Sequence, residues 1–285
     1  MAWTFSRDAE TFLHKRREFL SGSESLNCLA WAAIVRSKND KPGEQSHSFL
    51  TFGDGPAISA HAFIQRRGED LVLSPMSNIQ AQQLADTLAD SGVQVRIAEG
   101  PREAILSFSR QWSDATGAVH EHVMDQGLHE LRSVDMPDLA GGRLIRAEAV
   151  HRPELSALVE GFVACFPHES MTPDGVAKRV DRFIHEQRAF LWQDENENSV
   201  SMAAIVRESP NASSISWVYT PPDHRRQGHA ARVVATLSQA QLDAGKSACN
   251  LHTDLSNPTS NSVYRRIGYR QIAEAVRMRF PSDRP

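Results

Sequence analysis

The 285-residue chain has little of what defines several large classes of protein. Its three cysteines are far apart and form no C-x-x-C pair, so they indicate neither a disulfide framework nor a zinc site. No apolar run approaches the roughly 20 residues that span a bilayer. Lysine and arginine together number 31 against 35 acidic residues, without a long basic run. We therefore expect no metal, no membrane and no nucleic acid among its partners.

The composition is that of a globular protein long enough for two domains. Hydrophobic residues make up 40% of the chain and charged residues 23%, which excludes a disordered or fibrous protein. The length is about twice that of a typical domain. Because the first 20 residues are charged rather than signal-like, we expect a cytoplasmic location.

Hydrophobic periodicity predicts a regular order of elements in the first half of the chain. Helices are expected at 8–20, 26–35, 78–91 and 101–117. Strands are expected at 48–53, 58–64, 70–74, 93–97 and 119–131. Proline, aspartate and glycine then crowd residues 135–142, a composition typical of an interdomain linker.

The second half predicts the same order with one strand added in front. Its expected strands are 143–147, 189–193, 200–206, 214–220, 247–252 and 269–280. Its expected helices are 152–166, 173–187, 228–244 and 257–267. The sequence therefore predicts two domains of similar architecture, 1–134 and 143–285, joined by the linker at 135–142.

The segment 215–244, ISWVYTPPDHRRQGHAARVVATLSQAQLDA, carries the strongest functional pattern. It reads as a strand that passes through a Pro-Pro break into an amphipathic helix. The first N–H groups of a helix lack partners within it, and the helix dipole is positive there, so a pyrophosphate fits. Gly228 lets the backbone approach such a ligand closely. An arginine-rich loop before an ordinary surface helix is the alternative interpretation.

The lettering of two segments resembles the GNAT superfamily of N-acetyltransferases. Arg225-x-x-Gly228-x-Ala230 resembles its coenzyme A loop, and LHTDLSNPTSNSVYRRIGYR, residues 251–270, resembles its later strand, loop and helix. The resemblance is sharp over 215–280 and lies only in the element pattern before residue 143. More narrowly, V-Y-T-P-P at 218–222 and T-D-L-x-N-P at 253–258 resemble a bacterial group of predicted acetyltransferases with a divergent N-terminal GNAT-like domain.

This resemblance implies a mixed α/β (α+β) fold of two tandem GNAT-like domains, each a mostly antiparallel sheet flanked by helices. The domain 143–285 would be the catalytic one, and 1–134 a non-catalytic relative. The implied activity is transfer of an acetyl group from the co-substrate acetyl-CoA to an amine of a small molecule or peptide, by direct attack in a ternary complex. The protein would be a monomer or a homodimer.

The same resemblance implies which residues bind the coenzyme. They are Val218, Tyr219, Arg225, Arg226, Gln227, Gly228, His229, Ala230, Asn257, Asn261 and Tyr264. Side chains matter less than backbone groups along the strand that ends at Tyr219 and in the loop 225–230. For Asn257, a role as the N-cap of the helix before Pro258 is compatible with coenzyme contact.

Two catalytic roles follow from the resemblance. Tyr264 matches the general acid that protonates the departing thiolate, because a phenol with a pKa near ~10 stays protonated at neutral pH. The alternative for Tyr264 is an aromatic side chain that only packs its helix. For the base that deprotonates the acceptor, the sequence offers Glu169, His168, His252 and Asp254. Glu169 is the candidate because it follows the helix at 152–166, in a region that commonly borders the acceptor pocket, and an exposed loop glutamate without a catalytic role is the alternative.

The first half contains no tyrosine, and its equivalent junction, LVLSPMSNIQAQQ from Leu71, has no R-x-x-G-x-A loop. We therefore expect no coenzyme site there. An alternative function for the whole chain is a coenzyme A-binding sensor or interaction module without turnover. The acceptor is not encoded in any one motif, because its pocket is assembled from distant loops.

Overall fold

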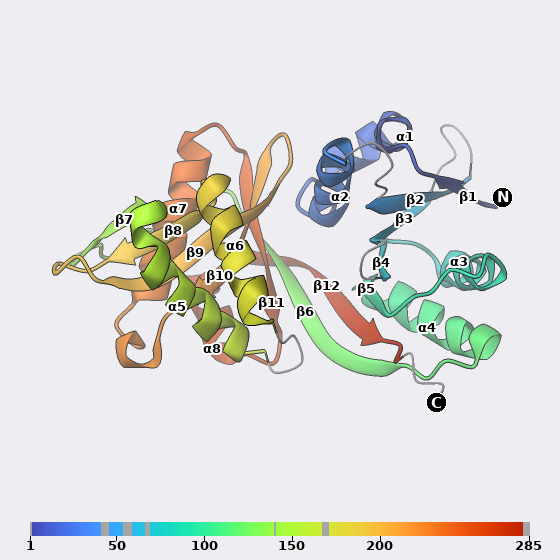
Figure 1. The fold of residues 1–285 in the computed structure, drawn as a ribbon. Coiled ribbons are helices and arrows are strands. Elements are labelled where there is room, and N and C mark those ends of the chain that lie inside the picture. Colours follow the sequence, from blue (N-terminus) through green and yellow to red (C-terminus); the bar gives the residue numbers. More distant parts are fainter. Residues whose placement is uncertain are drawn as a thin grey trace. The chain divides into compact units, whose positions relative to one another are not determined.

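The computed structural model describes residues 2–40, 46–53, 59–65, 69–139, 141–166 and 171–281 (Figure 1). The first half consists of β1 (Trp3–Ser6), α1 (Ala9–Gly22), α2 (Cys28–Lys38), β2 (His47–Phe52), β3 (Ala60–Gln65), β4 (Asp70–Leu73), α3 (Asn78–Asp90), β5 (Ile97–Pro101), α4 (Arg102–Thr116) and β6 (Glu121–Leu131).

The second half consists of β7 (Arg143–Arg146), α5 (Arg152–Ala164), α6 (Pro173–His185), β8 (Ala189–Gln193), β9 (Ser199–Glu208), β10 (Ala212–Tyr219), α7 (His229–Asp243), β11 (Ala248–Asp254), α8 (Pro258–Arg266) and β12 (Arg270–Arg279). Short 3-10 turns at Ala149–His151 and Pro222–His224 precede α5 and α7.

Both halves have the same order of elements, β-α-α-β-β-β-α-β-α-β. The expectation that the second half has one additional strand was wrong, because the four-residue strand β1 was too short to show a period in the sequence. β1 pairs antiparallel with β2 from Trp3↔Phe52 to Ser6↔Phe49. The repeat is therefore complete in both halves.

The strand expected at 93–97 was also misplaced and lies at Ile97–Pro101. The sequence pattern placed Pro101 at the start of a helix, but Gly100 and Pro101 both belong to β5. Gly100 has φ +153°, and a Cβ there would lie 2.6 Å from the Leu73 carbonyl oxygen. Glycine is thus what permits β5 to lie close to β4.

The chain packs into two compact units that are not continuous in sequence. Unit 1 contains residues 1–128, 253–256 and 271–285, and unit 2 contains 129–252 and 257–270. The predicted domains, 1–134 and 143–285, stay a prediction, because the two units describe only which residues pack together. From Gln271 onward, β12 is therefore part of the first unit.

Unit 1 is built on strands in the order β1-β2-β3-β4-β5-β12. β12 pairs antiparallel with β5, from Ala275↔Pro101 to Arg279↔Ile97, and β4 pairs parallel with β5. Successive side chains of β2 lie on opposite faces of the sheet. Leu50 packs in the core with α3 and α4, whereas Phe49 packs in the core with α1 and α2. Helices thus cover both faces of the sheet.

Unit 2 has the strand order β11-β10-β9-β8-β7, with the end of β6 beside β11. The antiparallel strands β7 to β10 pair in sequence, and β10 pairs parallel with β11. One face packs on α7 through residues such as Ile205 and Val233, and the other packs on α5 and α6 through Met202 and Val180. No helix in the described residues is long and apolar enough to cross a membrane.

Because Phe280 directly follows β12 and packs with that strand in the core of unit 1, we predict that Phe280→Ala lowers the free energy of unfolding by about 3–5 kcal/mol. Phe280 is 3% exposed and its ring contacts Phe108 and Trp112, with centroids 6.2 and 6.3 Å away. Chemical denaturation of the full chain gives the measurement. Ile272→Ala, at a position of β12 that is 40% exposed, is the control and should change stability by less than about 1 kcal/mol. Equal effects of the two substitutions would show that β12 is not part of that core.

Candidate functional site

The neighbouring strands β10 and β11 of unit 2 pair over only three positions. Their parallel register runs from Ala212↔Ala248 to Ser214↔Asn250, although β10 continues to Tyr219 and β11 to Asp254. Beyond Ser214 the two strands no longer pair. The edge of β10 that faces β11 is therefore open to an extended ligand, which would add to it as a strand does.

A β-bulge lies in this open part of β10. On β9, Ala204 pairs with Ser216 and Met202 pairs with Tyr219, so two residues of β10 oppose one of β9. One of these two, Trp217, has φ +54°, a rare conformation for a bulky residue. Such a backbone conformation costs on the order of 1–3 kcal/mol, and it persists only where the surrounding structure stabilises it.

Aromatic packing holds the bulge. The Trp217 ring lies 4.6 Å from the ring of Phe162 on α5 and 5.5 Å from that of Phe183 on α6. The guanidinium of Arg179 lies 5.1 Å from the Trp217 ring, and burial lowers the pKa of Arg179. The sequence pattern does not indicate a special role for Trp217, because a bulge depends on register with the next strand.

The helix α7 begins directly after the strand and its loop, and its first turn has no side-chain cap. Its N-cap is Gly228, with φ +84° and ψ 0°, and no side chain of the described residues caps the first N–H groups. A Cβ on Gly228 would meet only the guanidinium of Arg232, at 3.8 Å or more. The space before this helix is therefore open, and its N–H groups point into it with the positive end of the dipole.

Hydrogen bonds within unit 2 hold the loop that leads to α7. Arg232 donates from Nη1 to the Gln227 carbonyl at 2.9 Å and from Nε to the Asp138 carbonyl at 2.8 Å. Arg225 donates from Nε to the Thr220 carbonyl at 3.0 Å. These hydrogen bonds to backbone carbonyls fix the loop. Residues 225–228 are exposed, so the outer surface of the loop stays accessible.

Other predicted loop residues have mixed positions. Arg226 is exposed and has φ +63°, so the loop bends there. His229 is 7% exposed, and its Nε2 lies 3.3 Å from the Gln227 Oε1; burial, then the nearby Arg232, lowers its pKa. Ala230 is partly buried in the first turn of α7. The His229 side chain is therefore buried at the start of α7, and its contact with the coenzyme stays a prediction.

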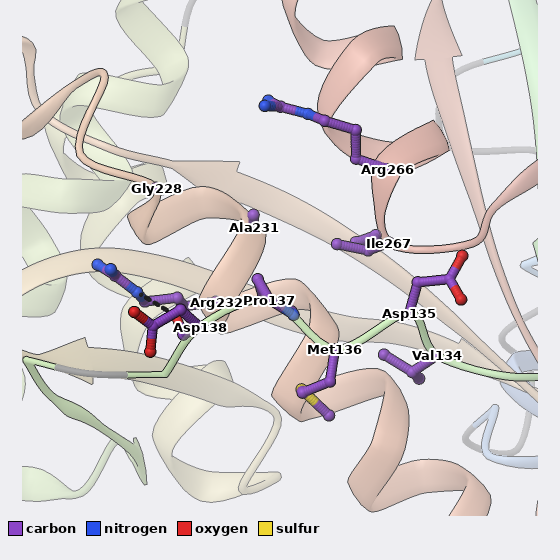
Figure 2. A pocket seen from close by; sticks show the side chains of 10 residues that line it. All are labelled: Val134, Asp135, Met136, Pro137, Asp138, Gly228, Ala231, Arg232, Arg266 and Ile267. Carbon is purple, nitrogen blue, oxygen red and sulfur yellow. Dashed lines mark hydrogen bonds between the residues drawn. The ribbon is translucent and has the colours of Figure 1, made fainter.

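A cavity of about 830 Å³ adjoins the start of α7 (Figure 2). Its walls come from α7, from the end of α8 and from the connection that follows β6. They are formed by Val134, Asp135, Met136, Pro137, Asp138, Gly228, Ala231, Arg232, Arg266 and Ile267. The volume lies within the range of small-ligand sites, and two arginines line it. The sequence pattern identified only Gly228 of these residues, because the connection at 134–138 is far away in sequence.

The predicted residues of α8 share one face of that helix. Asn257, Asn261 and Tyr264 are spaced i, i+4 and i+7. Asn257 caps the helix, its Oδ1 accepting from the Ser260 N–H at 3.1 Å. Tyr264 packs against the core under α7, with its ring 6.0 Å from that of Tyr269. Burial raises the pKa of Tyr264 to about 12, so its hydroxyl keeps its proton at neutral pH.

Val218 and Tyr219 end the open part of β10. Val218 packs on the α7 side of the sheet and Tyr219 on the side of α5, where a Cβ at Gly161 would lie 2.5 Å from the tyrosine hydroxyl oxygen. The Tyr219 carbonyl accepts from the Ser201 hydroxyl at 3.0 Å. The glycine on α5 therefore makes room for the tyrosine side chain.

Of the four candidates for the base that deprotonates the acceptor, two lie within the described residues and two do not. Glu169 and His168 lie outside them, so the assignment of Glu169 stays a prediction. His252 lies on β11, and burial, with Arg207 and His129 nearby, lowers its pKa to about 3. Asp254 accepts from the N–H and hydroxyl of Ser256 at 2.8 and 2.7 Å, which fixes the turn before α8. In the described part of the chain, no group of three or more His, Cys, Asp or Glu is placed to hold a metal ion.

The equivalent helix of unit 1 begins differently. The hydroxyl of Ser77 accepts from the Gln80 N–H at 3.3 Å, and the Gln80 side chain accepts from the Ser77 N–H at 2.8 Å. This reciprocal capping box satisfies donors that α7 leaves open. The two units therefore differ at the position where an anion would bind.

Comparison with known proteins bears on the family and on the fold. Residues 193–278 match the family model of FR47-like proteins. A search of curated proteins found no match. A GCN5-related N-acetyltransferase from Sphaerobacter thermophilus has a TM-score of 0.66 and 15% identity, over 99% of this chain and 97% of that one.

Two further solved structures cover the chain from end to end. A GNAT-family acetyltransferase from Colwellia psychrerythraea has a TM-score of 0.60 and 13% identity, over 99% of this chain and 100% of that one. A tandem GNAT protein from the clavulanic acid biosynthesis pathway has a TM-score of 0.54 and 8% identity, with the same coverage.

The fold is that of the GNAT acetyltransferases, and it extends over both halves of the chain. Residues 193–278 carry, within that fold, the sequence pattern of FR47-like proteins. The predicted resemblance and the predicted fold class are therefore confirmed.

Proposed function

We propose that the protein is an N-acetyltransferase that moves an acetyl group from acetyl-CoA to an amine. The observation that carries this proposal is the combination of an open β10 edge with an uncapped helix directly after it. The fold and the FR47-like segment support acyl transfer in general. The open edge suits an extended amide-containing arm, and the helix start suits the pyrophosphate to which that arm is joined.

The pyrophosphate would bind to the N–H groups at Gly228 to Ala230. The first turn of α7 has no competing side-chain acceptor, and Arg225 and Arg226 lie at its surface without a carboxylate partner in the described ranges. Guanidinium forks match phosphate oxygens. The adjoining cavity, with Arg232 and Arg266 in its walls, has room for the nucleotide end of the coenzyme.

The bulge at Trp217 and Val218 would bind the acetyl end of acetyl-CoA. Because this segment turns out of register with β9, a backbone N–H near Val218 can point toward the developing oxyanion rather than into the sheet. Attack by the neutral amine and loss of the coenzyme thiolate then require a proton donor. The protonated phenol of Tyr264 fits that role.

A coenzyme A-binding sensor without turnover would need the same binding groups but no proton donor. The placement of Tyr264 on the same helix face as Asn257 favours the enzyme. The two functions are distinguished by whether coenzyme A is released from acetyl-CoA when amines are added.

We predict that Gly228→Val weakens acetyl-CoA binding by roughly 100-fold or more, equivalent to about 3 kcal/mol. The added side chain would occupy the space before α7 and strain a backbone at φ +84°. Calorimetry on the purified full chain gives the affinity, and the wild type should bind one equivalent, because the start of α3 is already capped.

Gly245→Val is the matched control for this prediction. Gly245 follows α7 at its other end, has φ +95° and has open space around its Cβ position. It should carry the same backbone strain and leave the affinity within about threefold. Equal affinities of the two variants, or two equivalents bound by the wild type, would contradict the proposed site.

We predict that Tyr264→Phe lowers turnover by roughly 10- to 1000-fold while acetyl-CoA affinity changes little, because a general acid is lost. Steady-state release of coenzyme A, measured where chemistry limits the rate, tests this. Tyr269→Phe is the control: it removes a hydroxyl that bonds to Ser238 at 2.9 Å in the core and should retain turnover. Full turnover by the Tyr264 variant would show that another group supplies the proton.

A further inference from the structure

A row of polar side chains crosses three strands of unit 2. Arg207 on β9 is the register partner of Ser214 on β10, and Ser214 is the partner of Asn250 on β11. Side chains of directly paired residues lie on the same face of a sheet. The hydroxyl of Ser214 donates to the Asn250 Oδ1 at 2.7 Å, which ties two members of the row together.

The row lies on the face that α5 and α6 cover. Ile215, the next residue along β10, packs in the core under α7, so Ser214 faces the opposite way. Ser216, two residues beyond Ser214, pairs with Ala204, which belongs to the core under α5 and α6. The polar row therefore lies beside the apolar core of that face rather than under α7.

Two groups in this row lack a partner in the described part of the chain. Asn250 is 1% exposed, and its Nδ2 is buried without a hydrogen bond. Arg207 is partly exposed and, among the described residues, forms no ion pair. A buried donor without a hydrogen bond destabilises the folded chain, and a ligand that accepts a hydrogen bond from it would remove that cost.

The electrostatic potential around the row is positive. His252 lies two residues beyond Asn250 on the same strand and therefore on the same face. After burial, the influences that lower its pKa are the charges of Arg207 and His129, with no carboxylate from the described residues opposing them. Anionic groups are thus favoured at this position and cationic groups are not.

The row also lies where the chemistry is expected. Ser214↔Asn250 is the last pair before β10 and β11 diverge, so the row borders the open strand edge on the side of α5 and α6. A guanidinium reaches a carboxylate through a planar fork of two N–H donors, a geometry that lysine does not provide.

We propose that Arg207 and the Asn250 amide form a subsite for a carboxylate of the acceptor, so that the acceptor is a small molecule with both an amine and a carboxylate. This inference rests on the proposed function, because it assigns the substrate class of the same site. Ser214 orients the Asn250 amide, and the neutral His252 ring lines the subsite without repelling the anion.

The test is a set of matched acceptors, each an amino acid and its carboxamide, with acetyl-CoA and the full-length chain. For the wild type we expect kcat/KM to be at least about tenfold higher for the acid than for the amide, as a charged hydrogen bond contributes. Arg207→Gln should raise the KM for the acid roughly 10- to 100-fold, leave its kcat within about threefold and leave the amide unaffected. Arg207→Lys should recover only part of the loss.

Arg143→Gln is the control, since Arg143 lies on β7 and pairs with Glu197 at 2.8 Å. It should keep the preference for the acid. A wild-type preference for amides, or equal losses on acid and amide in Arg207→Gln, would overturn the inference. Unchanged acetyl-CoA affinity in Arg207→Gln shows that the variant is folded.

A second measurement separates this inference from the proposed function. If no acceptor releases coenzyme A, the proposed function fails, and the subsite is tested by calorimetry with N-acetyl amino acids and their amides as probes. Binding of the acids that is at least about tenfold tighter in the wild type, and is lost in Arg207→Gln, supports the subsite. Equal binding of acids and amides by the wild type overturns it.

Discussion

The divergence of β10 from β11 after the pair Ser214↔Asn250 is the feature on which the rest of unit 2 depends. A strand in the interior of a sheet normally has both edges paired, and leaving one open exposes donors and acceptors. Here the opening is stabilised from the side: the bulge at Trp217 is held by the rings of Phe162 and Phe183. The open edge is therefore built into the packing of α5 and α6.

The same arrangement sets the direction of the ligand. The open edge leads from Ser214 to Tyr219 and continues through the loop to the uncapped start of α7. An extended molecule with an anionic end would lie with that end at Gly228 and its other end near the polar row at Arg207. Unit 1 repeats the element order but closes the equivalent helix start with Ser77 and Gln80. We therefore propose that unit 1 does not bind the coenzyme.

The sequence predicted most of the elements because their hydrophobic periods are regular, and it predicted the Gly228 loop because a glycine before an amphipathic helix has a local physical meaning. It missed features that depend on contacts distant in sequence. β12 joins the first unit, the connection at 134–138 lines a cavity with α7, and the Trp217 bulge depends on register with β9. The row from Arg207 to Asn250 was missed for the same reason, since its members lie on three strands.

The backbone from β10 to the start of α7 is proposed to bind the coenzyme, and amide hydrogen exchange with and without acetyl-CoA reports on this backbone residue by residue. Amides of 215–219 and 227–231 should become protected when acetyl-CoA is added, because the ligand would pair with the open edge and cover the uncapped helix start. Amides around Ser77 to Ala81 should not change. Protection confined to the start of α3, or none in 215–231 at saturating acetyl-CoA, would contradict the account.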